Sequence, residues 1–245
     1  MRKKRSYCIK TTSNRPTKRV GKCLNEIHGK YMKNKYKYIL MCGGEYEQWQ
    51  SPRHFIEYQG ETLVGRTIRL LRENGISDIA ISSDDVRFKR FGVPVMVHKN
   101  DYYAVRYNES TGHWCDCFYP TSIECCYLFG DVLFSDKAIK TIVEYETEDI
   151  MLFGSKPPFA SNYPKIYIEP FAFKVSNQKH LHQAIKEVKR IDQEGGFKRK
   201  PIAWELWSII KGTNPNEINY DYCSINDYTC DIDYPYEIPE VVKHD

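Results

Sequence analysis

From residue 36 onward, short apolar runs alternate with longer amphipathic segments. Nearly uninterrupted apolar runs are typical of strands that are buried on both faces. The runs that predict strands are Tyr38–Cys42, Ile79–Ser83, Val93–His98, Cys125–Phe129, Asp149–Phe153 and Ile166–Val175. Apolar residues at three- and four-residue spacing predict helices over Leu63–Asn74, Ser135–Tyr145, His180–Ile191 and Ile202–Ile210. Ser135 is the predicted N-cap of the second helix, and Gly75 terminates the first.

Strands that alternate with amphipathic helices predict an α/β protein, with three α/β/α layers and a mainly parallel, mixed central sheet. Ligands of such sheets bind outside the carboxyl ends of the strands. Three polar or glycine pairs directly follow predicted strands, namely Gly43-Gly44, Ser82-Ser83 and Gly130-Asp131. We therefore expect them at one edge of the sheet.

The charge of the chain is distributed unevenly. Residues 1–37 contain thirteen Lys and Arg against a single acidic residue, and the rest contains 23 against 31, a net charge of −8. We expect residues 1–35 to be a basic extension that need not be ordered, and residues 36–245 to be the folded domain. The extension is a candidate for attachment to nucleic acid, a membrane face or an acidic partner, but it lacks interleaved aromatic residues that stack on bases. No nucleic-acid partner is expected for the main domain.

The composition of the chain bears on its cellular location and its oligomeric state. No apolar run approaches the roughly 20 residues that span a bilayer, and the start lacks the apolar stretch of a signal peptide. The nine Cys are an odd, scattered set, which favours reduced thiols and a cytoplasmic location. A homodimer is left open, because the sequence does not identify the oligomeric state.

The first strand runs into a glycine loop, in the stretch "YILMCGGEYEQWQSPRHF". A strand that breaks into such a loop often brings backbone N–H groups close to phosphate. The loop from Glu45 to Ser51, however, holds two acidic residues and no basic one. A phosphate bound here needs a cation from elsewhere.

A carboxylate directly after a buried strand, as in Gly130-Asp131, is held rigidly and can bind a hard cation. Asp231 and Asp233 flank Ile232 in a segment that reads as extended, where residues i and i+2 project to the same side. If this segment lies against the same edge, one or both carboxylates complete a Mg²⁺ site with Asp131. The alternative is a solvated acidic turn.

In order along the chain, "ILMCGG", "SPRHFIEYQGETLVGRTIRLLRENGISDIAISS", "YLFGDVLFS" and "DIDYPYEI" resemble motifs of the GT-A-like nucleotidyltransferases. These enzymes join a nucleoside triphosphate to a sugar phosphate or another phosphorylated small molecule. The resemblance implies a Rossmann-like GT-A-type fold and Mg²⁺ as cofactor. It implies Asp131 and Asp233 as metal ligands, with Asp231 as an alternate.

Two departures from the family pattern concern phosphate binding. The family's second loop Gly and its Arg are absent where this chain reads "EYEQ", and its Pro-Lys is here Pro52-Arg53. We expect Arg53 to reach the phosphates, because its fork suits bidentate contacts. Arg66 and Arg69, whose helical spacing points to solvent, are weaker candidates for the missing loop Arg. The expected nucleotide-binding residues are Cys42, Gly43, Gly44, Arg53, Ser82, Ser83 and Gly130, with Arg53 and Asp131 as the catalytic residues.

Three residues are expected to contact the acceptor. By resemblance Glu169 binds acceptor hydroxyls, with a structural carboxylate as the alternative. His98 and Asn100 follow the third predicted strand and either line the acceptor pocket or form a plain loop.

The implied reaction is attack by an acceptor phosphate on the α-phosphorus of a nucleotide, which expels pyrophosphate. "DIDYPYE" is most similar to cytidylyltransferases that act on small phosphorylated alcohols, which favours CTP. The product would be a nucleotide-linked precursor, as in nucleotide-sugar biosynthesis. Two alternatives stay open: a GT-A glycosyltransferase, although Gly-Asp-Val stands where Asp-x-Asp is usual, and a nucleotide-binding protein without turnover.

Overall fold

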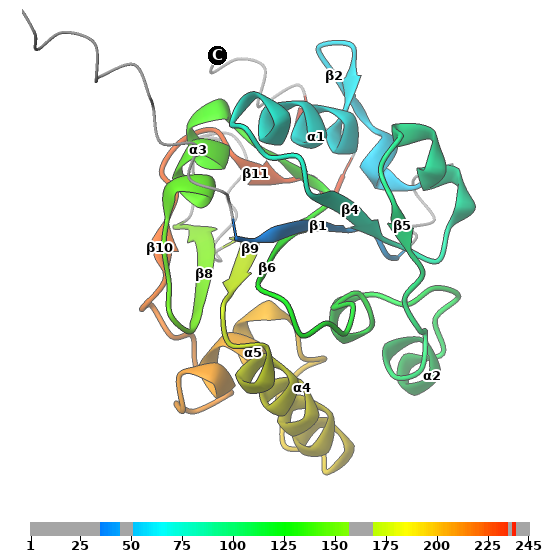
Figure 1. Ribbon diagram of the computed structural model, residues 1–245. Helices are drawn as coiled ribbons and strands as arrows, with labels where there is room; N and C mark the ends of the chain where they lie inside the picture. Colours follow the sequence, from blue (N-terminus) through cyan, green and yellow to red (C-terminus); the bar gives the residue numbers. More distant parts are fainter. Residues whose placement is uncertain (1–34, 45–50, 157–168, 235–236, 239–245) are drawn as a thin grey trace, which may run out of the picture. The chain divides into compact units, whose positions relative to one another are not determined.

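A seven-stranded mixed sheet forms the centre of the folded unit (Figure 1). The computed structural model describes residues 35–44, 51–156, 169–234 and 237–238. The basic extension up to residue 34, most of the loop after Gly44, and the predicted strand start at 166–168 lie outside the described residues. The expectation about the extension therefore stays a prediction.

The strands follow the order β10-β8-β9-β6-β1-β4-β5 across the sheet. Their bounds, in that order, are Cys223–Ser224, Ile150–Ser155, Glu169–Val175, Cys125–Phe129, Lys37–Met41, Ile79–Ser82 and Val95–Met96. Strand β9 is antiparallel to both β6 and β8, while every other pairing in this sheet is parallel. The predicted mainly parallel, mixed sheet is confirmed.

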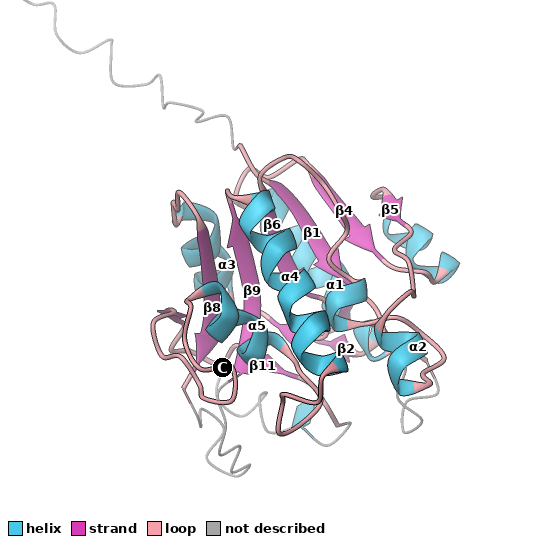
Figure 2. Ribbon diagram, turned by 90° about the horizontal axis from the view of Figure 1, so that it is seen from below, coloured by secondary structure: helices cyan, strands magenta, loops and turns pink. Residues whose placement is uncertain are grey.

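Helices lie on both faces of the sheet, which gives the three predicted layers. Their bounds are α1 Leu63–Glu73, α2 Tyr103–Tyr107, α3 Asp136–Glu144, α4 Gln178–Gln193 and α5 Ala203–Ile210. Helices α1 and α3 cover one face, and α4 and α5 cover the other (Figure 2). The strands of the centre are consequently buried on both sides, as β4 and β6 are throughout their length. This burial is the physical reason for their apolar sequences.

The long helices begin where short polar side chains cap them. The hydroxyl of Thr62 accepts a hydrogen bond from the N–H of Gly65 at 3.1 Å, and that of Ser135 accepts one from Ala138 at 2.9 Å. Each cap satisfies a backbone donor that has no partner inside the helix. Helix α1 ends at Glu73, and Gly75 follows its C-cap Asn74 with a φ of +78°, which is costly for other residues. The predicted cap at Ser135 and the predicted stop at Gly75 are both confirmed.

A second, two-stranded sheet joins distant parts of the sequence. Strand β7 (Val132–Leu133) pairs antiparallel with β11 (Cys230–Asp231). Ile232 follows β11, is fully buried, and packs in a small apolar cluster with Leu63 and Leu133. Burial of Ile232 anchors the C-terminal segment against Leu63 at the start of α1 and Leu133 of β7. This segment was predicted to be extended, and the ladder with β7 sets its register.

Several short elements were absent from the sequence prediction. They are the hairpin β2–β3 (Glu57–Tyr58 and Glu61–Thr62), helix α2, strands β7, β10 and β11, and three 3₁₀ turns at Arg53–Phe55 (η1), Val86–Phe91 (η2) and Trp114–Asp116 (η3). Strands of two residues and helical turns of three to six residues are too short to show a hydrophobic period, so tertiary contacts decide them. Within the described ranges, the structure has no helix with both the length and the apolar content required to cross a bilayer.

Candidate functional site

The carboxyl ends of β1, β4 and β6 meet at one edge of the main sheet. In the parallel register, Met41 lies opposite both Ser82 and Phe129. The N–H of Gly130 donates to the Met41 carbonyl at 3.0 Å, and the N–H of Cys42 donates to that of Ser82 at 2.9 Å. The residues that follow the three strands are therefore neighbours, as expected from the order of strands and helices.

An arginine and two aspartates form the centre of this edge. The guanidinium of Arg53 makes an ion pair through Nη2 with Oδ2 of Asp131, and through Nη1 with Oδ1 of Asp233 at 2.7 Å. The three side chains are 11%, 13% and 25% exposed. Arg53 begins the 3₁₀ turn η1, directly after Pro52. Residues that are 78 and 180 positions from Arg53 in the sequence thus meet in one partly buried cluster.

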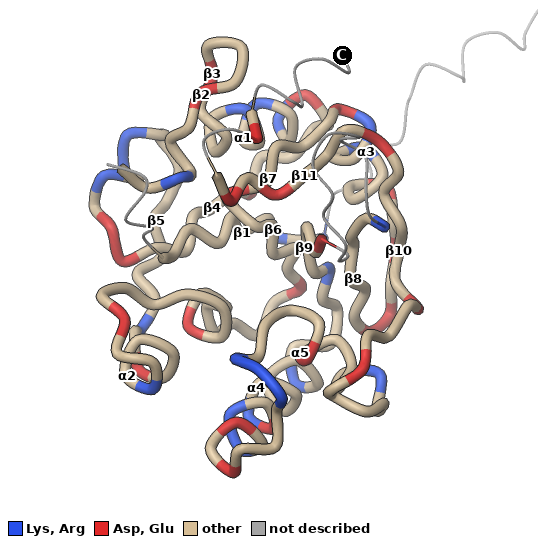
Figure 3. Tube along the Cα trace, turned by 180° about the vertical axis from the view of Figure 1, so that it is seen from behind, with Lys and Arg blue, Asp and Glu red and all other residues tan. Residues whose placement is uncertain are grey.

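The ladder between β7 and β11 positions the two carboxylates. The N–H of Ile232 donates to the carbonyl of Asp131 at 3.1 Å, which aligns the segment around Asp233 with the Gly130-Asp131 turn. A carboxylate oxygen of Glu237 accepts hydrogen bonds from the N–H of Asp233 at 2.6 Å and of Tyr234 at 3.0 Å. This backbone frame fixes Asp233 beside Asp131. Figure 3 shows acidic positions of the chain at β7 and β11.

His54 lies beneath this cluster and adds no charge to it. Its ring is 1% exposed and stands edge-on to Phe88, with centroids 5.5 Å apart. Burial lowers the pKa of His54 to about 4; the nearby Asp131 opposes this shift and Arg53 adds to it. The imidazole is therefore neutral at pH 7, and Arg53 is the cation that the two aspartates share. Nothing in the residue pattern marked His54 for this place.

The donor set suits a magnesium ion that is shared with a substrate. Mg²⁺ is typically held by one or two carboxylates plus substrate phosphates. The carboxylates of Asp131 and Asp233 both contact the guanidinium of Arg53. They therefore converge on one place that accommodates a cation. Among the residues that the structure describes, no three His, Cys, Asp or Glu side chains are grouped so as to hold a metal by themselves. The pair would hold the metal with water or phosphate oxygens as the remaining ligands.

Asp231 and Glu169 lie next to this pair. Strand β9 runs antiparallel to β6, so its first residue, Glu169, is at the same edge as Asp131. Glu169 is 7% exposed, and its Oε2 accepts a hydrogen bond from the N–H of Asp231 at 3.0 Å. Glu169 thus ties the main sheet to β11, which is the structural role weighed for it. Contact with an acceptor stays a prediction.

His98 and Asn100 lie in a different part of the edge. His98 is 4% exposed, with Nδ1 3.1 Å from the hydroxyl of Ser82, and burial lowers its pKa. The amide nitrogen of Asn100 donates to a carboxylate oxygen of Asp84. Three strands, β6, β1 and β4, separate β9 from β5, the strand that precedes His98. Strand order thus places His98 and Asn100 on one side of β1 and Glu169 on the other, and contact of His98 and Asn100 with an acceptor stays a prediction.

The glycine pair after β1 packs against residues 112–117. A Cβ on Gly43 would collide with the carbonyl oxygen of Gly112 and the sulfur of Cys117. Gly44 has a φ of +86°, and a Cβ there would lie 3.6 Å from the Cβ of His113. Close packing against residues 112–117 is thus one reason for glycine here, beside the expected approach of phosphate. Burial raises the pKa of the Cys42 thiol, which lies beside Gly43 and therefore packs as an apolar side chain.

His113 belongs to a polar cluster with Glu109 and Lys200. Its Nδ1 is 2.9 Å from Oε2 of Glu109, and its Nε2 is 3.2 Å from Nζ of Lys200. Burial lowers the pKa of His113 to about 4. Lys200 lies 87 positions from His113, so no local pattern could have joined them.

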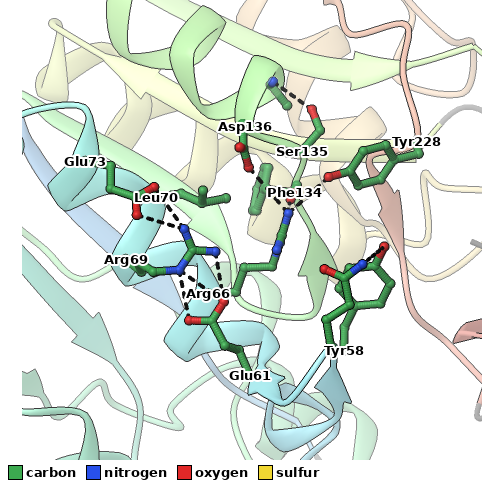
Figure 4. A network of polar contacts seen from close by, with 12 residues as sticks. Tyr58, Glu61, Arg66, Arg69, Leu70, Glu73, Phe134, Ser135, Asp136 and Tyr228 are labelled. Atoms are coloured by element: carbon green, nitrogen blue, oxygen red, sulfur yellow. Dashed lines mark hydrogen bonds and ion pairs between the residues drawn. The ribbon is translucent and has the colours of Figure 1, made fainter. Parts of the chain in front are cut away.

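Arg66 and Arg69 of α1 have structural partners (Figure 4). Arg66 is 7% exposed, and its side chain donates to the carbonyl of Phe134 at 3.2 Å and to the hydroxyl of Tyr228 at 3.0 Å. Arg69 pairs with Glu61 and Glu73 at 2.8 and 2.9 Å. The expectation that both arginines face solvent is wrong for Arg66, which joins α1 to the β7–α3 turn and to the C-terminal segment. Neither is placed to replace the missing loop Arg.

Arg66→Ala should lower the free energy of unfolding by about 2–3 kcal/mol, because it leaves a buried carbonyl and a hydroxyl without their charged donor. It should leave the triphosphate affinity of the folded protein unchanged. Chemical denaturation and nucleotide titration measure the two effects. Arg72→Ala, on the exposed side of the same helix, is the control and should change neither quantity. If Arg66→Ala lowers the triphosphate affinity, Arg66 takes part in phosphate binding and this prediction is wrong.

The fold is shared with known proteins, although the sequence is not. No protein-family profile and no curated protein sequence matches the chain. A Bacillus anthracis protein described as a glucose-1-phosphate thymidylyltransferase, solved in complex with sucrose, superposes with a TM-score of 0.54 at 16% identity, over 84% of this chain and 93% of that one. This likeness confirms the fold that the sequence motifs implied. At such an identity it establishes the fold alone.

Two further solved structures cover similar lengths with lower scores. An inositol-1-phosphate CTP transferase from T. maritima has a TM-score of 0.45 at 15% identity, over 86% of this chain and 96% of that one. A CTP:phosphocholine cytidylyltransferase from Streptococcus pneumoniae has a TM-score of 0.43 at 14% identity, over 85% and 99%.

Proposed function

We propose that the protein is a Mg²⁺-dependent nucleotidyltransferase that couples a nucleoside triphosphate to a small phosphorylated acceptor and releases pyrophosphate. The observation that carries the proposal is the cluster of Arg53, Asp131 and Asp233 at the carboxyl ends of the central strands. Ligands of open α/β sheets bind at this edge. The protein of the same fold from Bacillus anthracis is described as an enzyme of this reaction type.

The residues of the cluster have complementary tasks in this reaction. Asp131 and Asp233 would hold the metal, which neutralises charge on the triphosphate when it is bound. Arg53 presents a planar fork of donors that matches phosphate oxygens. The backbone N–H groups of Gly43 and Gly44 are the remaining proposed donors. Transfer of this kind depends on positioning and charge neutralisation, so it requires no nucleophilic Ser or Cys.

For the substrates, we propose CTP as the nucleotide and a sugar phosphate or phosphorylated alcohol as the acceptor. Support for CTP comes from the motif around Asp231 and Asp233. The polar groups at Ser82, His98 and Asn100 lie on one side of β1, and Glu169 lies on the other. Of these, we propose Ser82 and the adjacent Ser83 for the nucleotide side. Glu169 is nearer to the acidic pair and is the proposed contact for the acceptor.

Pyrophosphate release, measured with a panel of four triphosphates and several acceptor phosphates in the presence of Mg²⁺, tests this proposal. Release that needs both a triphosphate and an acceptor supports it, and the most active triphosphate identifies the base. Triphosphate binding without release would instead indicate a nucleotide-binding protein without turnover, the alternative favoured by the altered glycine loop. Consumption of a nucleotide sugar without pyrophosphate release would indicate a glycosyltransferase.

Arg53→Ala should weaken binding of metal-free triphosphate by about 10- to 100-fold, since hydrogen bonds to charged groups contribute about 1.5–3 kcal/mol. Arg53→Lys should recover part of this loss, because it keeps the charge and loses the fork. Titration calorimetry without a divalent cation measures the effect. Arg69→Ala is a matched control, since Arg69 also joins two carboxylates, and it should bind as tightly as the parent. Unchanged affinity in Arg53→Ala would remove Arg53 from the phosphate site.

A further inference from the structure

Arg53 lies where the proposed metal would have to contact the protein. Its two terminal nitrogens hold one oxygen each from Asp131 and Asp233. The same two carboxylates form the proposed metal site. The guanidinium therefore acts as the counter-cation of the acidic pair.

A guanidinium and a divalent cation cannot both contact these carboxylates without strong repulsion. Two cations at contact distance repel each other strongly where the effective dielectric constant is well below that of water, and the second charge of the divalent ion doubles this repulsion. The low exposure of Arg53 and Asp131, 11% and 13%, limits screening by water. Arg53 and the metal should thus compete for the pair.

We propose that Arg53 holds the acidic pair in the absence of substrate, and that the metal enters as Arg53 transfers from the carboxylates to the triphosphate. This inference rests on the proposed function for the identity of the anion that receives Arg53. One arginine then serves two sites in turn: it keeps the pair neutralised when the site is empty and binds phosphate when the site is filled.

The exchange couples the two ligands. Metal alone binds weakly because it must displace Arg53, and triphosphate strengthens metal binding because it offers the guanidinium another partner. Such coupling is reciprocal, so metal must raise triphosphate affinity by the same factor. Without Arg53, the metal site would be open at all times and this part of the coupling would vanish.

Mn²⁺ binding, followed by electron paramagnetic resonance of the free ion in the absence of nucleotide, tests the competition directly. Arg53→Ala should bind Mn²⁺ at least about 10-fold more tightly than the parent, because a charge-assisted ion pair no longer has to be broken. The double variant Arg53→Ala with Asp131→Asn should lose this gain. Arg69→Ala, which frees another pair of carboxylates on the surface, should leave the affinity unchanged.

Thermal unfolding of the same variants is a second measurement of metal binding. It stays informative if the Arg53→Ala protein is less stable than the parent. Mn²⁺ should raise the melting temperature of Arg53→Ala more than that of the parent. An Arg53→Ala protein that binds Mn²⁺ no more tightly than the parent, or not at all, would overturn the inference. Both readouts use metal without substrate, so they can succeed even where pyrophosphate release fails and the proposed function falls.

Discussion

Asp131→Asn should reduce metal-dependent pyrophosphate release by at least about 100-fold, the usual effect of removing one preorganised electrostatic group from an active site. Asparagine keeps the shape of the side chain but removes the charge that holds the metal. The amide oxygen of the introduced side chain can still accept a hydrogen bond from Arg53, so the fold should be retained. Asp233→Asn should have an effect of the same order, because the two carboxylates share one cation.

Steady-state kinetics over a range of Mg²⁺ concentrations, combined with circular dichroism, measures this prediction. Asp149→Asn is the matched control: its carboxylate precedes β8, is half exposed, and contacts His180 at the surface. It should keep the parent rate. Full turnover by Asp131→Asn would show that the acidic pair has a structural role only, and the proposed metal site would be abandoned.

Lys174→Ala should lower the free energy of unfolding by about 3–5 kcal/mol, the largest stability effect that we expect from a polar residue of this chain. Lys174 lies within β9 and is fully buried. Its ammonium donates to the carbonyls of Ile142 and Val143, at 2.9 and 3.0 Å, in the last turn of α3. The nitrogen also lies 4.4 Å from the centroid of the Tyr36 ring. Removal of the side chain leaves a cavity and two carbonyls without their charged donor.

Chemical denaturation measures the loss, and two variants separate its causes. Lys174→Met keeps most of the volume and removes the donors, so it should recover part of the stability. Lys140→Ala, on the exposed side of α3, should change stability by less than about 0.5 kcal/mol. A Lys174→Ala protein as stable as the parent would mean that water replaces the ammonium at the end of α3.

The local structure followed from the sequence to a large extent. The strands β1, β4 and β6 are apolar runs because both of their faces are covered, and α1 and α3 begin at hydroxyl caps that local pattern identifies. From strand–helix alternation alone, Gly43, Ser82 and Gly130 were expected at one edge, and the parallel register places them there. These features depend on neighbours in the sequence or on a general property of α/β sheets.

The partners of buried charges did not follow from local pattern. Arg66 and Arg69 are three positions apart on α1, yet one is buried against Phe134 and Tyr228 and the other pairs on the surface with Glu61 and Glu73. In the sequence, Lys174 is a charged residue within a mainly apolar strand. Only the tertiary structure shows that its hydrogen-bond acceptors lie at the end of α3. His98 and Glu169 lie on opposite sides of β1, because β9 pairs with β6 whereas His98 follows β5. Each outcome depends on which element packs against which.

By itself, the sequence determined the layered α/β architecture, the edge at which the polar pairs collect, and the residues worth testing there, because hydrophobic period and strand–helix alternation are encoded locally. Only the tertiary structure decided that Asp131 and Asp233 share the guanidinium of Arg53. That contact depends on the short ladder between β7 and β11 and on burial of Ile232. Neither feature has a local signature, since the free energy that brings these distant segments together comes from contacts formed only in the folded chain.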